Sequence, residues 1–170
     1  TYRLADRNVK FKYASAVKFP LLETFEQSTE FFSINADGVN MEISNEENKT
    51  VGKITLQDSV KLFDIKSPIY YLKGSGNFTF WEMDYKCDND IAIGLFVHTS
   101  TGTISPVSLI TLNKTNGVWK KIYINLTSTL TNYTSSAATI GVELVMTGNR
   151  LTNNNITNFY FDNIKLITFE

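Results

Sequence analysis

The sequence has 170 residues, the length of one domain, which is enough to bury a core without disulfides or a structural metal. Its 16 basic and 17 acidic residues leave a net charge of −1, which argues against nucleic acid or an anionic membrane as the main partner. No uninterrupted apolar run reaches the ~20 residues that a membrane-spanning helix needs, so no transmembrane segment is expected.

The first 18 residues are more basic than the rest of the chain, and in residues 9–13 apolar or aromatic side chains alternate with lysines. This stretch is predicted to be an N-terminal edge strand or a linker to a preceding module, and the domain itself is predicted to span residues 19–170. Because the sequence begins at Thr1 and not at Met, we expect a chain from which a signal peptide or lipid anchor has been removed.

Short alternating runs separated by turn residues follow along the whole chain. Residues 19–26 form the first run, which contains Pro20 and therefore belongs at a strand start or a sheet edge. Further strands are expected at residues 39–43, 51–56, 60–65, 69–72, 77–86, 91–98, 139–146 and 158–169. The long runs at 77–86 and 91–98 are expected to be neighbours near the centre of the fold. The single cysteine, Cys87, is expected to be a buried free thiol.

Residues 107–126 contain two further alternating runs, joined by a polar segment that ends in Asn116-Gly117. Asn and Gly tolerate the left-handed backbone of tight reversals, so this stretch is predicted to be a β-hairpin. In total about ten strands are expected, and no window has the 3.6-residue apolar period of a helix. The sequence therefore predicts an all-β fold, a two-sheet antiparallel β-sandwich.

Three short motifs carry a resemblance to a known group of proteins. They are Phe25-Glu26, the run from Gly117 through Trp119 to Leu126, and the terminal run from Tyr160 to Leu166. Together they resemble the β-jelly-roll carbohydrate-binding modules and their galactose-binding-like relatives, over nearly all of residues 19–170. The sequence is also similar in style to cell-surface lipoproteins of Bacteroidetes.

The resemblance implies a structural calcium ion. In that group of proteins, an acidic residue of the first strand and an aspartate of the last strand often share the ion, and these positions match Glu26 and Asp162. Calcium takes six to eight oxygen ligands, which two carboxylates and nearby carbonyl oxygens of paired strands could supply. The alternative is that both residues are ordinary acids at the solvent face, because no loop dense in acidic residues accompanies them.

Aromatic side chains are the candidates for stacking on a sugar. In residues 77–86, Trp81 and Tyr85 point to one side of the predicted strand, and Glu82 and Asp84 point to the other. Trp81 and Tyr85 either belong to the core, which is the favoured interpretation, or form a binding platform. The adjacent Tyr70 and Tyr71 must point to opposite faces of their strand, so one of the two is expected near the surface.

Catalytic signatures are weak. Glu82-Met83-Asp84 is faintly similar to the catalytic strand of jelly-roll glucanases, but Lys86 and Cys87 occupy the place of the second catalytic glutamate. The only histidine, His98, has no second histidine for a metal site, and no Gly-x-Ser-x-Gly motif is present. His98 is therefore interpreted as a structural or surface residue, and no enzyme activity is expected.

The resemblance implies a non-catalytic carbohydrate-binding module of a secreted or cell-surface bacterial protein. Its partner would be a glycan or polysaccharide, and neighbouring domains of a larger chain are a further possibility. Two alternatives stay open: an adhesion or spacer module that binds proteins, and, third in order, a glycoside hydrolase. An exposed apolar patch without a groove would favour the adhesion module.

Overall fold

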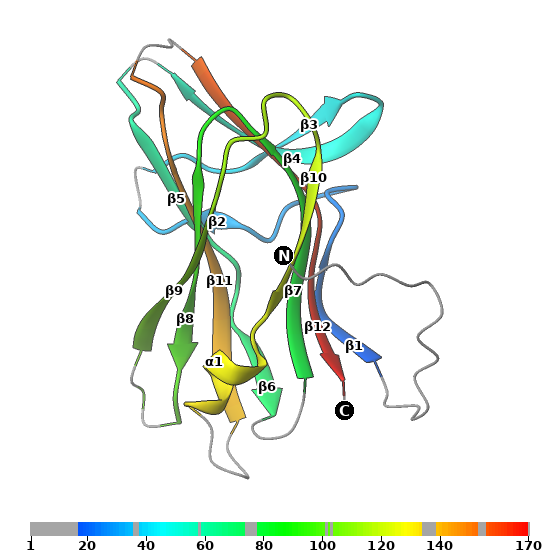
Figure 1. The fold of residues 1–170 in the computed structure, drawn as a ribbon, viewed down its shortest axis with the longest axis vertical. Coiled ribbons are helices and arrows are strands. Elements are labelled where there is room, and N and C mark those ends of the chain that lie inside the picture. The colour runs from blue at the N-terminus through cyan, green and yellow to red at the C-terminus, as the bar shows by residue number, and fades with distance from the viewer. Residues whose placement is uncertain are drawn as a thin grey trace.

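Two antiparallel β-sheets of six strands each pack face to face in the computed structural model (Figure 1). The structure describes residues 17–35, 38–57, 59–73, 78–100, 102, 104–133, 139–152 and 156–169. No helix in this part of the chain is long and apolar enough to cross a bilayer. The predicted all-β, two-sheet antiparallel sandwich is therefore confirmed. An edge strand or linker was predicted for residues 1–18, of which residues 1–16 lie outside the described residues.

Sheet A contains the first and the last described strands. Its strands run in the order β10-β7-β12-β4-β3, and β1 also pairs with β12. The bounds are β1 Val17–Glu23, β3 Glu42–Glu46, β4 Lys49–Gln57, β7 Phe78–Cys87, β10 Lys120–Asn125 and β12 Ile156–Phe169. The 14-residue β12 is long enough to pair with β4 along its first half and with β1 along its second half.

Sheet B contains the remaining strands, in the order β2-β5-β11-β8-β9, and β6 also pairs with β11. The bounds are β2 Phe32–Ser33, β5 Leu62–Lys66, β6 Tyr70–Lys73, β8 Ile91–His98, β9 Ile104–Leu112 and β11 Thr139–Asn149. The central β11 pairs with β6 along its first residues and with β5 along its last ones, so β5 and β6 follow each other along the same side of β11.

The two chain ends meet in the pairing of β1 with β12. Val17 lies opposite Phe169 and Glu23 lies opposite Ile164. The register shifts between Lys18 and Leu21, where Pro20 interrupts the hydrogen bonding, and such an interruption is tolerated because β1 is an edge strand.

The inner faces of the two sheets form one apolar core. Trp81, Phe63, Phe159 and Phe161 are its largest fully buried aromatic members besides Phe25. The rings of Phe63 and Phe159 meet edge to face, with centroids 4.8 Å apart. Burial of each such side chain contributes about 1.5–3 kcal/mol, so this core provides the main stabilisation of the sandwich.

Cys87 belongs to the same core, as predicted. It is a free cysteine whose exposure is 1%. Burial raises the pKa of its thiol to about 11, and the nearby Asp90 and Asp88 add to this rise against a lowering hydrogen bond from Thr115. A thiol in this state is inert at neutral pH.

The predicted hairpin at residues 107–126 is wrong, although its turn is correct. Asn116 and Gly117 do have left-handed backbones, with φ of 53° and 79°. However, β9 pairs with β8 in sheet B, and β10 pairs with β7 in sheet A. The segment is an arch that carries the chain from one sheet to the other, because a turn fixes the reversal of the chain and not the partner of the strand that follows.

The strands β7 and β8, which were expected to be neighbours, also lie in different sheets. Only three residues connect them, and these take the chain across one end of the sandwich. One short helix, α1 at Thr127–Thr131, follows β10 and buries Leu130 against the core.

Candidate functional site

Trp81 and Tyr85 are core residues. Trp81 is fully buried and Tyr85 is 4% exposed, and both point from β7 toward sheet B. Glu82 and Asp84 point to the outer face of sheet A, so the predicted division of this strand into two faces is correct. Because a sugar cannot stack on a buried ring, the structure corrects the assignment of Trp81 and Tyr85 to a binding platform and agrees with the core interpretation.

Tyr70 and Tyr71 point to opposite faces of β6, as predicted. Tyr71 is 72% exposed on the outer face of sheet B, which makes it the most exposed large apolar or aromatic side chain in the described part of the chain. Tyr70 packs against the core and its hydroxyl donates a hydrogen bond to Glu30 Oε2. Of the four aromatic residues predicted to bind a ligand, only Tyr71 presents its ring to solvent.

A row of residues extends across the outer face of sheet B from Tyr71. Tyr71 lies opposite Gly141 of β11, Gly141 lies opposite His98 of β8, and His98 lies opposite Ile104 of β9. A Cβ atom at Gly141 would come within 2.7 Å of Ile69 Cγ2 and 3.2 Å of His98 Cβ. The glycine therefore leaves room for Ile69 and for the edge of the Tyr71 ring, whose Cε1 would lie 3.5 Å from that Cβ.

Next to this row, Glu143 joins two basic side chains. Lys66 Nζ lies 2.6 Å from Glu143 Oε1, and His98 Nε2 lies 2.6 Å from Glu143 Oε2. The Glu143 side chain is only 4% exposed, so each carboxylate oxygen depends on its basic partner in place of water. Nε2 of His98 donates in this pair, because a carboxylate oxygen accepts.

Sequence reasoning missed Glu143 and Lys66. One signal could have indicated Glu143, because it is the only charged residue in the otherwise apolar run TIGVELVM. Lys66 gave no such signal, since β5 and β11 are far apart in sequence and only sheet pairing brings the two residues together. His98 is held by Glu143, which agrees with its interpretation as a structural residue.

Small and hydroxylated side chains occupy the centre of the same face. Ala92 and Gly94 of β8 lie opposite Thr111 and Ser108 of β9. On β11, Thr147 donates a hydrogen bond from Oγ1 to Asp64 Oδ1 at 2.8 Å. Lys66, Glu143 and His98 form an ion-paired cluster beside Tyr71, which we call the Glu143 cluster. A ligand that extends along this face from Tyr71 would first meet the Glu143 cluster and then these hydroxyl and carboxylate groups.

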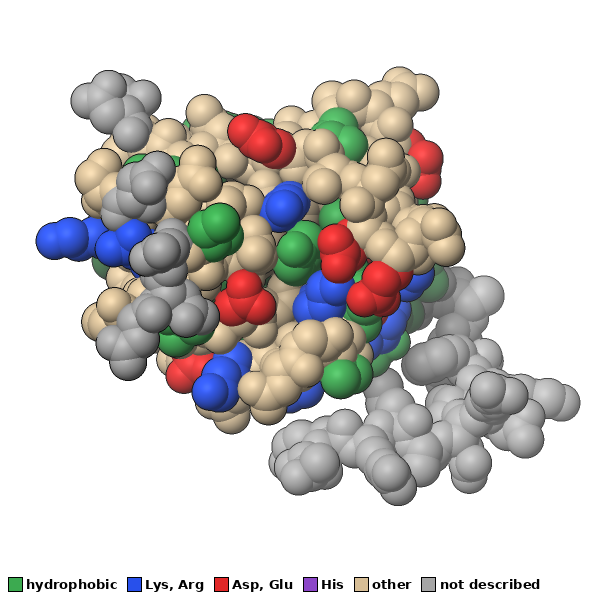
Figure 2. All heavy atoms as spheres, turned by 90° about the horizontal axis from the view of Figure 1, so that it is seen from above, with side chains coloured by type: hydrophobic (Ala, Val, Ile, Leu, Met, Phe, Trp, Pro, Cys, Tyr) green, Lys and Arg blue, Asp and Glu red, His purple; other side chains and the backbone are tan. Residues whose placement is uncertain are grey.

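The outer face of sheet A carries ion pairs of its own. Glu82 Oε1 lies 2.8 Å from Lys121 Nζ and 3.2 Å from Lys165 Nζ. Burial alone would raise the pKa of Glu82, but the hydrogen bonds from Lys121 and Lys165 lower it overall. The end of the molecule seen in Figure 2 likewise shows acidic and basic side chains next to one another.

Two aromatic rings on sheet A are covered by lysines. Lys86 Nζ lies 5.5 Å from the centroid of the Trp119 ring and 4.8 Å from that of Tyr160. Lys49 and Lys53 add a second cation to each ring. These cation–π contacts stabilise the sheet and occupy the ring faces on which a sugar would otherwise stack.

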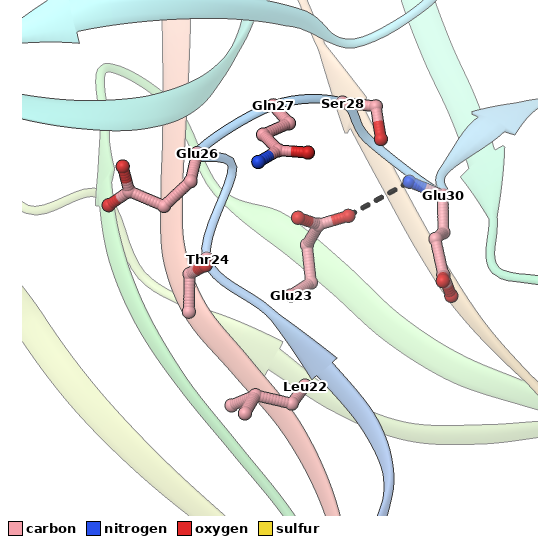
Figure 3. A pocket seen from close by; sticks show the side chains of 7 residues that line it. All are labelled: Leu22, Glu23, Thr24, Glu26, Gln27, Ser28 and Glu30. Carbon is pink, nitrogen blue, oxygen red and sulfur yellow. Dashed lines mark hydrogen bonds between the residues drawn. The ribbon is translucent and has the colours of Figure 1, made fainter.

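Glu26 and Asp162, the residues predicted to bind calcium, occupy different surroundings. Glu26 is exposed in the loop after β1, where it lines a pocket of about 250 Å³ together with Glu23 and Glu30 (Figure 3). Asp162 is 7% exposed on β12, and its oxygens accept hydrogen bonds from the backbone and side-chain nitrogens of Asn163.

No group of three His, Cys, Asp or Glu residues that could hold a metal ion occurs among the described residues. A calcium ion shared by Glu26 and Asp162 would therefore need backbone or amide oxygens for most of its ligands. The calcium site stays a prediction.

The sequence matches no protein-family model, and no curated protein is significantly similar to it. Several solved structures are similar to it in fold. The CBM22-1 xylan-binding domain from Paenibacillus barcinonensis has a TM-score of 0.58 at 11% identity, and the alignment covers 93% of this chain and 99% of that one. The family 11 carbohydrate-binding module of a cellulosomal cellulase from Clostridium thermocellum has a TM-score of 0.52 at 18% identity, with 89% and 95% covered.

A larger protein contains the same fold. The CBM22-1 and GH10 modules of a Clostridium thermocellum endo-1,4-β-D-xylanase, complexed with xylohexaose, align with a TM-score of 0.62 at 13% identity. The alignment covers 89% of this chain but 28% of the xylanase chain. Together, these likenesses show that the chain has the β-sandwich fold of carbohydrate-binding modules, as the resemblance in the sequence predicted.

Proposed function

We propose that the chain is a non-catalytic carbohydrate-binding module that binds a glycan on the outer face of sheet B. The observation that carries the proposal is the exposed ring of Tyr71 beside the Glu143 cluster, on a sandwich whose fold is shared with carbohydrate-binding modules. Aromatic rings bind the apolar face of a sugar, and fixed polar groups orient its hydroxyls.

Each part of this face has a definite role in the proposal. Tyr71 stacks on one sugar ring, and its 72% exposure leaves the ring accessible. Lys66 donates hydrogen bonds to hydroxyl oxygens, and the second ring nitrogen of His98 accepts one from a hydroxyl group. Glu143 holds both side chains in place. Ser108 and Thr111 extend the polar surface toward β9, where a further sugar of an extended chain would lie.

The non-catalytic part of the proposal has separate support. Hydrolysis of a glycosidic bond uses two carboxyl groups that flank the bond, one of which must act as an acid. Glu82 and Asp84, the pair most similar to a glucanase motif, both lie within ion-pair distance of Lys121. The hydrogen bonds from Lys121 and Lys165 lower the pKa of Glu82 against the effect of its burial, so this carboxyl group is not a proton donor at neutral pH.

The proposal is tested by affinity electrophoresis and calorimetry against xylan, soluble cellulose derivatives and galactan. We expect retardation by at least one of them, and Tyr71→Ala should abolish it. Tyr123→Ala is the matched control, because Tyr123 is also 57% exposed but lies on sheet A. Absence of binding to all these polysaccharides and to a broad glycan array would contradict the proposal.

We place the protein outside the cell or at the bacterial cell surface, as a domain of a larger polypeptide. Polysaccharides of this kind occur there, and the similar xylanase combines such a domain with a GH10 module. Detection of the protein in the cell-surface fraction by an antibody would test this placement, and recovery only from the cytoplasm would contradict it.

A second candidate function is an adhesion or spacer module that binds proteins. It is favoured by the apolar part of the outer face of sheet A, where Val17, Phe169 and Phe78 lie side by side in one row. Val17 and Phe78 are 47% and 60% exposed, and the neighbouring Phe19 is 51% exposed. Contiguous exposed apolar surface of this kind is typical of protein interfaces.

Chemical cross-linking of the protein at the cell surface separates the two candidates. If sheet A binds a protein, Phe78→Ser should reduce a specific cross-linked product and leave glycan binding unchanged. If no product depends on Phe78, the second candidate is not supported.

A further inference from the structure

Strand β6, which carries Tyr71, is held by few contacts of its own. It has four residues, and among the described strands its backbone pairs with β11 alone, from Tyr70 opposite Val142 to Lys73 opposite Thr139. Its outer residues are Tyr71 and Lys73, and its inner residues are Tyr70 and Leu72, of which Leu72 is buried. A strand this short needs further contacts to keep a fixed orientation.

Tyr70 supplies such a contact. Its ring packs against the core, and its hydroxyl donates a hydrogen bond to Glu30 Oε2 in the loop between β1 and β2. Burial raises the pKa of Tyr70, and the hydrogen bond to Glu30 and the charge of that carboxylate raise it further. The hydroxyl therefore keeps its proton at physiological pH and remains the donor.

Glu30 is itself fixed by Glu23 at the end of β1. The backbone nitrogen of Glu30 donates to Glu23 Oε2 at 2.8 Å, and that of Phe25 donates to Glu23 Oε1 at 2.8 Å. Glu23 is 6% exposed and Phe25 is fully buried. Figure 3 shows the Glu23 carboxylate directed toward the Glu30 backbone while the Glu30 side chain points away. A continuous connection thus runs from the edge of sheet A to the strand that carries Tyr71.

We propose that the Tyr70–Glu30 hydrogen bond is a positioning contact that holds the Tyr71 ring beside Gly141 in the orientation that the glycan meets. Tyr70 and Glu30 touch no ligand in this arrangement. They act through β6, and the inference rests on the proposed function of the sheet B face. A ring that is already oriented loses less conformational freedom when a sugar stacks on it, so the contact raises affinity.

Four variants test this role. Tyr70→Phe keeps the buried ring and removes the hydroxyl, and Glu30→Ala removes the acceptor, whereas Glu30→Gln keeps an oxygen that can accept. Thr55→Val is the matched control, because it removes a side-chain hydrogen bond of sheet A, from Thr55 Oγ1 to Asn158 Oδ1. Melting temperature, glycan affinity and amide hydrogen exchange of residues 70–73 are measured for all four.

We expect Tyr70→Phe and Glu30→Ala to weaken glycan binding about fivefold, the effect of one lost hydrogen bond, and to speed exchange in β6. Glu30→Gln should retain the affinity, and Thr55→Val should lower the melting temperature without a change in affinity. Unchanged affinity in Tyr70→Phe, in a protein whose binding is abolished by Tyr71→Ala, would overturn the inference while the proposed function stands.

If the unmodified protein binds no glycan, the proposed function fails. Amide hydrogen exchange of the unliganded protein then tests whether the Tyr70–Glu30 contact holds β6 in place. Exchange of residues 70–73 that is faster in Tyr70→Phe than in Thr55→Val supports the positioning contact. Equal exchange in the two variants overturns it.

Discussion

Glu143 holds together the polar part of the sheet B face because it is a buried carboxylate with a basic partner at each oxygen. An ionised carboxylate that is removed from water is costly unless it is paired, and the two contacts of 2.6 Å supply that compensation. The same pairing orients Lys66 and His98, which come from different strands.

Replacement of Glu143 tests this dependence. Glu143→Ala should lower the free energy of unfolding by about 3 kcal/mol, because it leaves two basic groups without their carboxylate next to the core. Urea denaturation measures the loss. Glu42→Ala, a change at an exposed glutamate of sheet A, should alter stability by no more than ~0.5 kcal/mol. Equal effects of the two substitutions would contradict the role of Glu143.

Asp162 makes stability depend on pH in a direction opposite to that of most acidic residues. Burial raises the pKa of its carboxyl group, the backbone hydrogen bond from Asn163 opposes the rise, and the charge of Asp84 adds to it. Since the pKa in the folded state exceeds that in the unfolded state, ionisation of Asp162 destabilises the fold above the folded pKa. The penalty disappears as the pH falls below the unfolded value.

The predicted consequence concerns Asp162→Asn, which keeps one oxygen to accept the Asn163 backbone hydrogen bond. The variant should gain stability relative to the unmodified protein as the pH rises from 3 to 7, because only the unmodified protein then carries the ionised, partly buried Asp162. Urea denaturation at both pH values measures this difference. A difference that is independent of pH would contradict the raised pKa.

At the scale of elements, the arch between β9 and β10 depends on two left-handed residues. Gly117 has a φ of 79°, which is strained for a residue with a Cβ atom. No atom lies within 4 Å of the place that a Cβ would occupy. A substitution there therefore lowers stability through backbone strain and not through a steric clash.

Gly117→Ala should therefore lower the free energy of unfolding by about 1 kcal/mol. Gly117→Asn should cost less, because Asn tolerates the left-handed region better than Ala. Thermal and urea denaturation of the two variants provide the comparison. If Ala and Asn cost the same, the left-handed conformation is not what the turn requires.

The strands themselves follow from the alternation of apolar and polar residues. In β8, for example, Ile91, Ile93, Leu95 and Val97 are buried, and the residues between them are partly or fully exposed. The same alternation could not reveal which strands are neighbours. The chain passes between sheets after β7 and after β9, and neither passage differs in sequence from a hairpin connection.

At the scale of the whole molecule, the predicted calcium site would link the loop after β1 to the last strand. If Glu26 and Asp162 share an ion, calcium should raise the melting temperature of EDTA-treated protein, because a ligand of the folded state stabilises it by mass action. Differential scanning calorimetry measures the shift, with magnesium as the control ion. The shift should disappear in Glu26→Gln. Equal melting temperatures in calcium and EDTA would contradict the calcium site.

The sequence alone determined that the protein is a two-layered β-sandwich and that its fold is that of carbohydrate-binding modules. The first follows from local information, because alternation decides strand and face, and the second follows from the resemblance that the motifs near Glu26, Trp119 and Asp162 carry. It also predicted that one ring of Tyr70-Tyr71 reaches the surface, since consecutive residues of a strand must point to opposite faces.

Only the tertiary structure decided which tyrosine is exposed and which residues surround it. Tyr71 and His98 lie opposite Gly141 from either side, and Glu143 pairs with Lys66, although the paired residues are up to 77 positions apart in sequence. Which strands pair depends on the burial of all the strands in one core. The sequence of a single segment therefore does not determine its partner. The group of residues around Tyr71 on sheet B could therefore be recognised only from the tertiary structure.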